Sequence, residues 1–302
     1  MINKYKKSAS ILCSILLATS CAVHKTKNNA AEFPKLSLES HRGGRGLHPE
    51  NTIIGMKSSI DMPKVTTLEM DCHITKDKKV VVYHDDYLNP KFVSYSDASP
   101  LQGADHKGLI YDYTYSQLGN FDLGLIGNAD FPQQKKISAK ISLLEDLIDQ
   151  TEKYAAGKAR EMMYNIETKS SANKDNIAHP EPQEFSDLVL EVVFNKKIQG
   201  RTVIQSFDKR TIQYIHQKYP SIRTSYLIDG KNKSSVAELI QDLGYKPFII
   251  SPYYKLVSAQ YVQDAHKLGI KVIPWTVNSE KEINELLSMG VDGIISDYPN
   301  LY

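Results

Sequence analysis

The feature that most constrains this chain is a regular alternation of short apolar runs with amphipathic helical patterns, which begins at Leu36. Such alternation predicts repeated βα units and a parallel sheet. The expected strands are Leu36–His41, Thr66–Ile74, Val80–His84, Met162–Lys169, Thr202–Phe207, Arg223–Ile228, Pro247–Ser251, Lys271–Val277 and Asp292–Ser296. The expected helices are Asn51–Ile60, Leu143–Tyr154, Glu184–Phe194, Lys209–Lys218, Ser235–Leu243, Ala259–Leu268 and Glu280–Met289.

Nine strands are one more than an eight-stranded barrel holds, and the surplus strand has a local explanation. The segment 75–79 is polar and too short for a crossover helix, so Val80–His84 should fold back on Thr66–Ile74 as an antiparallel hairpin. Pairing centred on Asp77 would bring His84 level with Glu69. Eight parallel strands remain, so the sequence predicts an α/β fold: a (β/α)8 TIM-type barrel over residues 36–302 with a β-hairpin at its catalytic rim.

The connection formed by residues 89–139 interrupts this pattern because it contains few strong apolar runs. Long connections in compact domains are usually functional or disordered. We therefore expect an insertion over the mouth of the barrel.

Residues 1–21 have the pattern of a signal peptide. Lys4, Lys6 and Lys7 precede the apolar stretch Ser8–Leu17, which is too short to cross a bilayer, since a spanning helix needs about 20 residues. Small residues then lead to Cys21, and this ending resembles a bacterial lipobox, in which the cysteine carries the lipid. Cleavage without lipidation is the alternative. With polar residues 22–35 as a tether, the chain is expected to be exported and lipid-anchored in the cell envelope, in the periplasm or at the outer membrane.

The charge and the cysteine content of the chain argue against a nucleic-acid partner and against an internal disulfide. The chain has 37 basic and 35 acidic residues, and removing the three leader lysines leaves 34 against 35, a net charge of −1. No basic surplus exists to bind a nucleic-acid backbone, so a nucleic-acid partner is not expected. If Cys13 is removed with the leader and Cys21 is lipidated, Cys72 is left alone and cannot form an internal disulfide.

The strand 66–74 carries acids on one face. Because strand side chains alternate, Glu69 and Asp71 share one face with His73, while the apolar residues between them share the other. Inward carboxylates in a buried barrel would repel each other unless a hard divalent cation, which prefers oxygen ligands, were bound. A half-exposed antiparallel strand is the alternative for this segment alone.

A second strand, 162–169, repeats this arrangement with Glu167 and Lys169 at its C-terminal end, where barrel active sites are built. Together, Glu69, Asp71 and Glu167 would supply three oxygen ligands, for which magnesium or calcium is more suitable than zinc. Arg42, after the first strand, could bind a phosphate with its planar guanidinium, and the neighbouring His41 could transfer protons near neutral pH.

Short motifs in a fixed order connect these residues to a known family. The series is His41-Arg42-Gly43, Pro49-Glu50-Asn51-Thr52, Glu69-Met70-Asp71, Thr75-Lys76-Asp77, Val81-Val82-Tyr83-His84-Asp85, Ile166-Glu167-Thr168-Lys169, Gln205-Ser206-Phe207, Trp275-Thr276-Val277-Asn278 and Gly290-Val291-Asp292-Gly293-Ile294-Ile295-Ser296-Asp297. It resembles the glycerophosphodiester phosphodiesterase family over essentially all of residues 36–302.

The resemblance implies a role for each site residue. Glu69, Asp71 and Glu167 would bind one divalent metal ion, Ca or Mg, and His41 and His84 would be the acid/base pair. The residues expected to bind or support the phosphate and substrate are Arg42, Lys169, Glu50, Asn51 and Trp275.

The expected reaction is metal-dependent hydrolysis of a glycerophosphodiester, such as glycerophosphocholine or glycerophosphoethanolamine, to glycerol phosphate and an alcohol. The sequence leaves open whether water or a substrate hydroxyl is the nucleophile. It also leaves open a related phosphodiesterase acting on lysophospholipid or inositol phospholipid, a carbohydrate-active barrel, and a non-catalytic envelope binding protein.

Overall fold

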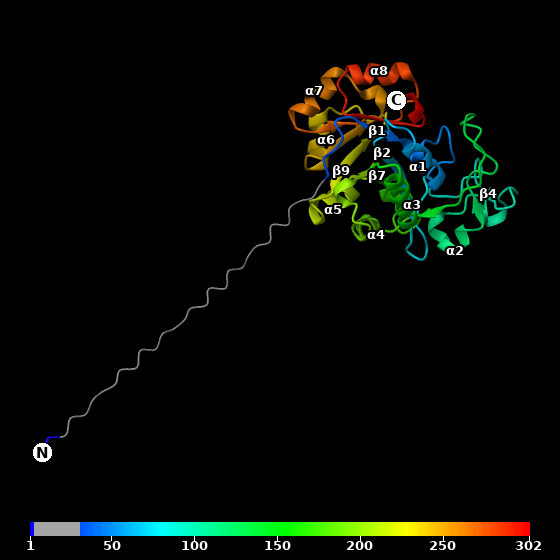
Figure 1. The fold of residues 1–302 in the computed structure, drawn as a ribbon, viewed down its shortest axis with the longest axis horizontal. Helices are drawn as coiled ribbons and strands as arrows, with labels where there is room; N and C mark the ends of the chain where they lie inside the picture. The colour runs from blue at the N-terminus through cyan, green and yellow to red at the C-terminus, as the bar shows by residue number, and fades with distance from the viewer. Residues whose placement is uncertain (3–30) are drawn as a thin grey trace.

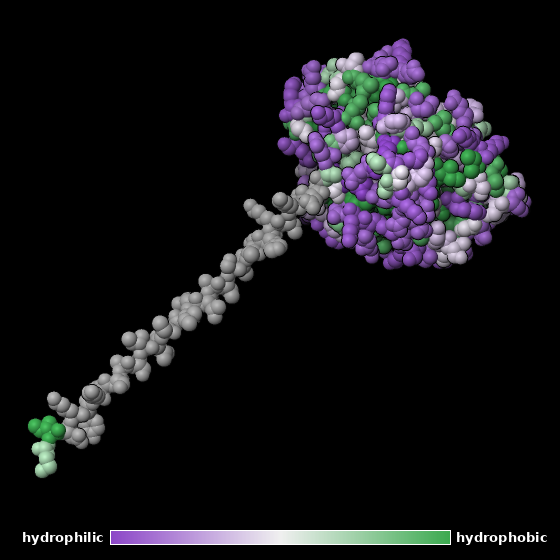
Figure 2. Space-filling view, viewed as in Figure 1, coloured by the Kyte–Doolittle hydropathy of each residue, from purple (hydrophilic) through white to green (hydrophobic). Residues whose placement is uncertain are grey.

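The computed structural model describes residues 1–2 and 31–302, and the second range forms a barrel domain with an attached subdomain (Figure 1). Residues 3–21 of the predicted signal peptide, which include Cys21, and most of the predicted tether lie outside the described residues. None of the described helices is both long and apolar enough to span a membrane. On the face shown in Figure 2, hydrophilic residues predominate and apolar ones are scattered among them, as on ordinary globular surfaces.

Eight parallel strands form the barrel. They are β1 (Ser37–Ser40), β2 (Thr67–Ile74), β7 (Met163–Thr168), β8 (Thr202–Ser206), β9 (Arg223–Ile228), β10 (Ile249–Pro252), β11 (Lys271–Val272) and β12 (Gly293–Ser296), hydrogen-bonded in the order β11-β10-β9-β8-β7-β2-β1-β12. The ring closes because the amide of Ile295 donates to the Pro274 carbonyl at 3.0 Å and the amide of Val277 donates to the Ile295 carbonyl at 3.0 Å. The predicted barrel is therefore confirmed. Strand β11 is shorter than the predicted Lys271–Val277, since Pro274 has no amide hydrogen to give to the ladder.

Helices cover the outside of this barrel (Figure 1). They are α1 (Ile53–Ile60), α3 (Leu144–Gly157), α4 (Pro182–Asn195), α5 (Lys209–Lys218), α6 (Val236–Leu243), α7 (Ala259–Lys267) and α8 (Glu280–Ser288). The apolar face of β2, with Leu68 and Met70, packs into one buried cluster with apolar residues of α1, α3 and α4. Helix α1 begins two residues later than predicted because Asn51 has φ 58° and Thr52 is the N-cap, accepting from the amide of Gly55.

The predicted hairpin is present. Strand β3 (Val80–Val82) pairs antiparallel with β2, and Cys72 lies opposite Val82. This register is centred on Asp77, so the chain after β3 carries His84 back along β2 toward the level of the acidic residues. Strand β6 (Ser142–Leu143) extends the sheet by pairing with β3.

The insertion forms a small subdomain beside the barrel (Figure 1). It contains the two-stranded sheet of β4 (Ser94–Tyr95) and β5 (Phe121–Asp122), the short helix α2 (Tyr115–Leu118) and 3-10 turns at 103–105 and 110–112. Its buried apolar residues form one cluster with Val81 of β3 and with Tyr83. Gln134 donates to the carbonyl of Arg45 at 2.8 Å, so the insertion flanks the barrel mouth at this loop.

Candidate active site

Three buried carboxylates meet at the C-terminal end of the barrel strands. Glu69 and Asp71 come from β2 and Glu167 from β7, where Asp71 and Glu167 are direct neighbours in the parallel register. One oxygen of each side chain lies within 4.8 Å of the other two. Alternation along the strands turns all three inward, so the structure brings together the three residues predicted as metal ligands.

These carboxylates fit a divalent cation. Burial, followed by the charge of Asp71, raises the pKa of Glu69 well above its ordinary value, and burial raises the pKa of Glu167 to about 7. The Oδ1 atom of Asp71 is buried and has no hydrogen-bond partner within residues 31–302. A cluster of buried, repelling carboxylates is costly, and a hard cation with oxygen ligands removes that cost. The donor set is compatible with magnesium or calcium and does not distinguish them.

Neighbouring groups orient the carboxylates. The backbone amide of Arg42 donates to Glu69 Oε2 at 2.7 Å, and Gln205 Nε2 donates to Glu69 Oε1 at 2.8 Å. Asn51 Nδ2 donates to Asp71 Oδ2 at 2.9 Å. Such outer contacts fix the geometry of metal ligands. The contact of Gln205 with Glu69 is not among the predictions from the sequence. The alternation of side chains along β8 nevertheless places Gln205 on the inward face.

Two cations lie beside the carboxylates. Arg42 contacts Glu50 (Nη1–Oε1 3.0 Å) and Asp71 (Nε–Oδ2 3.3 Å), and Lys169 Nζ lies 2.7 Å from Glu167 Oε1. Burial alone would raise the pKa of Asp71, but the charge of Arg42 and other nearby cations outweighs it and lowers that pKa. Both residues predicted to bind phosphate are therefore held at the carboxylate cluster of Glu69, Asp71 and Glu167.

The loop after β1 adopts an uncommon backbone conformation. Arg42 has φ 50°, in the left-handed region that L residues rarely occupy, which is typical of positions that tertiary contacts determine. The next residue, Gly43, has φ 73°, and a Cβ atom there would lie 3.0 Å from the backbone nitrogen of Met56. Glycine is therefore required for the loop to pack against α1.

Each predicted acid/base histidine contacts an aspartate. His41 Nδ1 lies 2.5 Å from Asp297 Oδ1, and His84 Nδ1 lies 2.6 Å from Asp85 Oδ1. Hydrogen bonding at Nδ1 orients the ring and leaves Nε2 available. Burial lowers the pKa of His41 to about 4, and burial with the charge of Lys169 lowers the pKa of His84 to about 3. Both rings are therefore neutral near pH 7.

The sequence motifs include Asp85 and Asp297 but assign them no role. Their positions in the sequence could have indicated a role at the site. Asp85 directly follows His84, and Asp297 follows the last strand at the same end of the barrel. Arg45, in the loop after β1, also contacts this aspartate, since its Nε donates to Asp297 Oδ1 at 2.7 Å.

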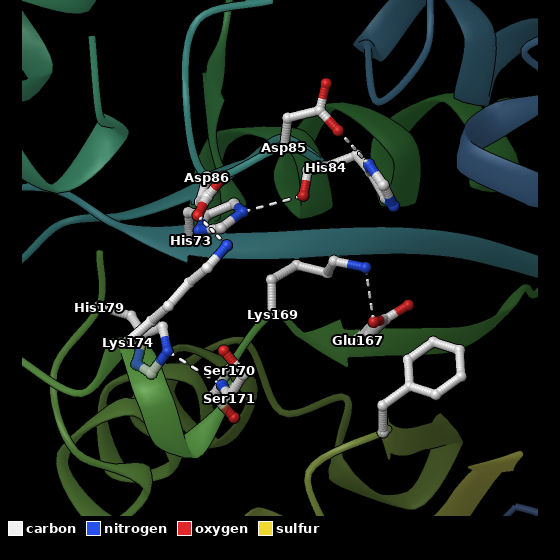
Figure 3. Close-up of a pocket in the computed structure, with 11 residues that line it drawn as sticks. His73, His84, Asp85, Asp86, Glu167, Lys169, Ser170, Ser171, Lys174 and His179 are labelled. Carbon is white, nitrogen blue, oxygen red and sulfur yellow. Dashed lines mark hydrogen bonds and ion pairs between the residues drawn. The ribbon is translucent and has the colours of Figure 1, made fainter. Parts of the chain in front are cut away.

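Two cavities border the carboxylates. The inner one, about 240 Å³, is bounded by His41, Arg42, Glu69 and Trp275 among others. The side cavity, about 250 Å³, is shown in Figure 3. The two cavities share the residues His84, Glu167, Lys169 and Phe207.

The aromatic wall of the inner cavity is fixed by packing. Trp275 Nε1 donates to the carbonyl of Ser251 at 2.9 Å. The rings of Trp275 and Phe207 pack edge to face, with their centres 5.3 Å apart. Phe207 is 39% exposed, which is unusual for a large apolar side chain, and no role was predicted for it. Every residue predicted for the site thus lies at this end of the barrel.

Comparison with known proteins points to one family. Residues 41–301 match the model of the glycerophosphoryl diester phosphodiesterase family. A glycerophosphodiester phosphodiesterase of Bacillus subtilis (strain 168) is 27% identical over 92% of this chain and 88% of its own length.

Solved structures show the same fold. A Silicibacter pomeroyi protein described as a glycerophosphoryl diester phosphodiesterase is 28% identical, with a TM-score of 0.77 over 90% of this chain and 93% of that one. An Oleispira antarctica phosphodiesterase in complex with the product sn-glycerol-3-phosphate is 23% identical, with a TM-score of 0.69 over 87% of this chain and 93% of that one.

Proposed function

Because the chain belongs to the glycerophosphoryl diester phosphodiesterase family and is thus a phosphoric diester hydrolase, we propose that it hydrolyses glycerophosphodiesters, such as glycerophosphocholine and glycerophosphoethanolamine, with a divalent cation, Mg²⁺ or Ca²⁺. The observation that carries this proposal is the buried cluster of Glu69, Asp71 and Glu167 beside His41 and His84, each of which contacts an aspartate. The products are glycerol phosphate and an alcohol.

The chain's own residues account for binding and proton transfer. Glu69, Asp71 and Glu167 would hold the cation, which when bound supplies Lewis-acid stabilisation of charge on the phosphate. Arg42 and Lys169 neutralise the charge that develops on the phosphate oxygens. Such preorganised charges act strongly in a site with little water.

Proton transfer is assigned to the two histidines. One takes a proton from the nucleophile as it bonds to phosphorus, and the other, once protonated, gives a proton to the alcohol oxygen as its bond to phosphorus breaks. The nucleophile is either water or a neighbouring hydroxyl of the substrate, and the second route gives a cyclic phosphate first. Phosphorus NMR during turnover separates them, because only the second route produces a transient cyclic signal.

One assay tests the proposed function. We expect the purified protein to release glycerol phosphate from glycerophosphocholine and glycerophosphoethanolamine with Mg²⁺ or Ca²⁺, and to lose this activity with a chelator. Lysophospholipid, inositol phospholipid and a glycoside substrate belong in the same panel. Turnover of lysophospholipid or inositol phospholipid alone would favour the related phosphodiesterase. Chelator-resistant glycoside cleavage, or no turnover of any substrate, would contradict the proposal.

We also propose that residues 1–21 direct export and that Cys21 carries a lipid anchor in the cell envelope, with residues 22–35 as the tether. This proposal is supported by the lysine-rich start, the short apolar stretch and the small residues before Cys21.

A further inference from the structure

We infer that Arg45 is a positioning residue for His41, and that residues 131–135 of the insertion act on the reaction by holding Arg45 in place. This inference rests on the proposed function, in which His41 transfers a proton. It gives the insertion a path to the site, although none of its residues lines either cavity.

Asp297 connects Arg45 to His41. The side chain of Asp297 is buried, and its Oδ1 lies 2.5 Å from His41 Nδ1 and accepts from Arg45 Nε at 2.7 Å. Its other oxygen, Oδ2, accepts from Asn278 Nδ2 at 2.7 Å. Because His41 and Arg45 share one oxygen, the position of Arg45 determines where that oxygen lies relative to the imidazole ring. The orientation of His41 therefore depends on Arg45 as well as on Asp297.

The contacts of Arg45 distinguish it from the two cations at the carboxylate cluster. Arg42 contacts Asp71 and Lys169 contacts Glu167. Within residues 31–302, the ion pairs of Arg45 are instead with Asp297 and with Glu50, whose Oε2 lies 3.8 Å from Nη1. Arg45 Nη2 also donates to Asp297 Oδ2 at 3.4 Å, so the guanidinium contacts both oxygens of this carboxylate. Such two-point contact fixes geometry, which is what a positioning residue must do.

The charge of Arg45 supports the same role. Burial alone would raise the pKa of Asp297, but the charges of His41 and Arg45 outweigh it and lower that pKa. Asp297 is therefore ionised near neutral pH. An ionised carboxylate accepts the proton on His41 Nδ1 and leaves Nε2 as the free nitrogen that takes a proton from the nucleophile.

Three contacts from the insertion fix the loop that carries Arg45. The Arg45 guanidinium lies over the ring of Phe131, 4.7 Å from its centre, where a cation is attracted to the aromatic face. The Gln134 side chain donates to the Arg45 carbonyl at 2.8 Å, and the Lys135 amide donates to the Leu47 carbonyl at 2.9 Å. The loop is thus attached to the insertion through one side chain and two backbone carbonyls.

The same loop also contacts the segment after β12. The amide of Gly46 donates to the Asp297 carbonyl at 2.9 Å, and a Cβ atom on Gly46 would overlap the ring of Tyr298. The loop therefore joins the insertion to the Asp297 segment, and Arg45 is the residue that contacts both. A change at Phe131 should reach His41 through Arg45 and Asp297.

Kinetics with Mg²⁺ or Ca²⁺ on glycerophosphocholine or glycerophosphoethanolamine, whichever wild type hydrolyses faster, test Arg45. Arg45→Met should lower kcat by about tenfold or more, the effect of losing one hydrogen bond to a charged group, and should change KM by less than about twofold. Arg45→Lys keeps a charged donor and should recover part of this loss. A raised KM with wild-type kcat in Arg45→Met would show a substrate contact and overturn the inference.

Arg201→Met is the matched control. Arg201 likewise contacts a carboxylate, with Nη2 2.6 Å from Glu152 Oε2, and lies 5.8 Å from the centre of the Tyr164 ring. It precedes β8, at the end of the barrel opposite the site, so kcat and KM should not change.

A second variant tests the role of the insertion. Phe131→Leu keeps an apolar side chain and removes the aromatic face, so kcat should fall by about two- to fivefold, the loss of an exposed cation–π contact. Added to Arg45→Met, it should cause no further loss, because both variants break the same path. A wild-type kcat in Phe131→Leu, or full additivity in the double variant, would overturn the assignment of the insertion.

A measurement without substrate separates this inference from the proposed function. In ¹⁵N NMR spectra, the His41 ring of wild type should have a protonated Nδ1 and an unprotonated Nε2. Arg45→Met should bring the two shifts closer together as the tautomers mix, and Arg201→Met should not. Unchanged His41 shifts in Arg45→Met would overturn the inference, whereas failure of wild type with metal to hydrolyse either glycerophosphodiester would overturn the proposed function.

Discussion

At the scale of single residues, the candidate site is a set of buried charges whose ionisation depends on their neighbours. Glu69 is an example, with Asp71 beside it, the Arg42 amide donating to one oxygen and Gln205 donating to the other. Each contact orients the carboxylate, but none neutralises the whole cluster. This dependence on neighbours gives three predictions, which concern Glu69, Asp297 and Glu39.

The first prediction concerns Glu69, a proposed metal ligand. Glu69→Gln keeps the shape of the side chain and removes its charge, so Mg²⁺ or Ca²⁺ affinity should fall by at least about 100-fold, beyond the 10–100-fold typical of outer-shell changes. Titration calorimetry measures this directly, without reference to activity. Glu191→Gln, at an exposed position, is the control and should bind metal like wild type. Wild-type affinity in Glu69→Gln would exclude Glu69 as a ligand.

The second prediction concerns Asp297. Asp297→Asn removes the carboxylate at His41 Nδ1 and should lower kcat by about 10²–10⁴, the usual contribution of acid/base catalysis. Asp297 raises the pKa of His41 against the larger effect of burial, so its loss should move the acid limb of the kcat/KM profile to lower pH.

The control for Asp297→Asn is Asp292→Asn, because Asp292 contacts His266 in a histidine–aspartate pair outside the site. Asp292→Asn breaks the 2.7 Å contact with His266 Nε2 and should leave the pH profile unchanged. An unchanged acid limb in Asp297→Asn would remove His41 from the role of base.

The third prediction concerns Glu39, which is 1% exposed inside the barrel. Burial raises its pKa from 4.5 to about 7, against the hydrogen bonds from Asn165 and Ser37. The folded state therefore retains a proton that the unfolded state loses, and stability should fall as pH rises from about 4.5 to 7. This shift corresponds to roughly 3 kcal/mol.

Glu39→Gln should abolish this pH-dependent change in stability, because glutamine does not titrate. The difference in free energy of unfolding between variant and wild type, measured by urea denaturation with chelator present, should move in favour of the variant from pH 5 to pH 8 and level off above about pH 7. A pH-independent difference would contradict the assignment.

At the scale of elements, the hairpin and the insertion act differently. Strand β3 is paired on both sides, with β2 and β6, and so holds the segment carrying His84 against the barrel. The apolar residues of the insertion cluster with Val81 and Tyr83 and not with the barrel core, and no insertion residue lines the two cavities at the site. The insertion should therefore open locally at lower cost than the barrel.

Paired phenylalanine substitutions test this difference. Phe121→Ala, in the insertion core, should cost about 3–5 kcal/mol locally and increase hydrogen exchange in residues 93–123, with metal binding retained. Phe185→Ala, in the fully buried face of α4, should instead lower the stability of the whole barrel. Equal loss of protection across the chain in both variants would show that the insertion and barrel unfold as one unit.

At the scale of the whole molecule, the proposed anchor determines where the barrel works. Cys21→Ser in the full chain should move the protein from the membrane fraction to the released fraction and abolish labelling by a radioactive fatty acid. Cys13→Ser, within the segment expected to be removed, is the matched control and should keep both. Labelling that persists in Cys21→Ser would refute lipidation at this residue.

Local sequence patterns predict the order and type of nearly all elements of the barrel. Helix Lys209–Lys218 and strand Arg223–Ile228 match their predicted bounds, because amphipathic periodicity and alternation are local properties. The same alternation assigned Glu69, Asp71 and Glu167 to inward faces. The insertion was harder to predict, since its buried residues are irregularly spaced and form no periodic run.

Contacts between groups that are distant in the sequence depend on how the whole barrel packs. His41 and Asp297 are 256 residues apart in the sequence. They are in contact only because β12 pairs with β1 and closes the barrel. The orientation of Glu69 by Gln205, and the side cavity between the loops that follow β3 and β7, likewise depend on barrel closure. Alternation along a strand fixes the direction of a side chain, whereas strand order and register fix its partner, and these arise only when the whole chain has packed.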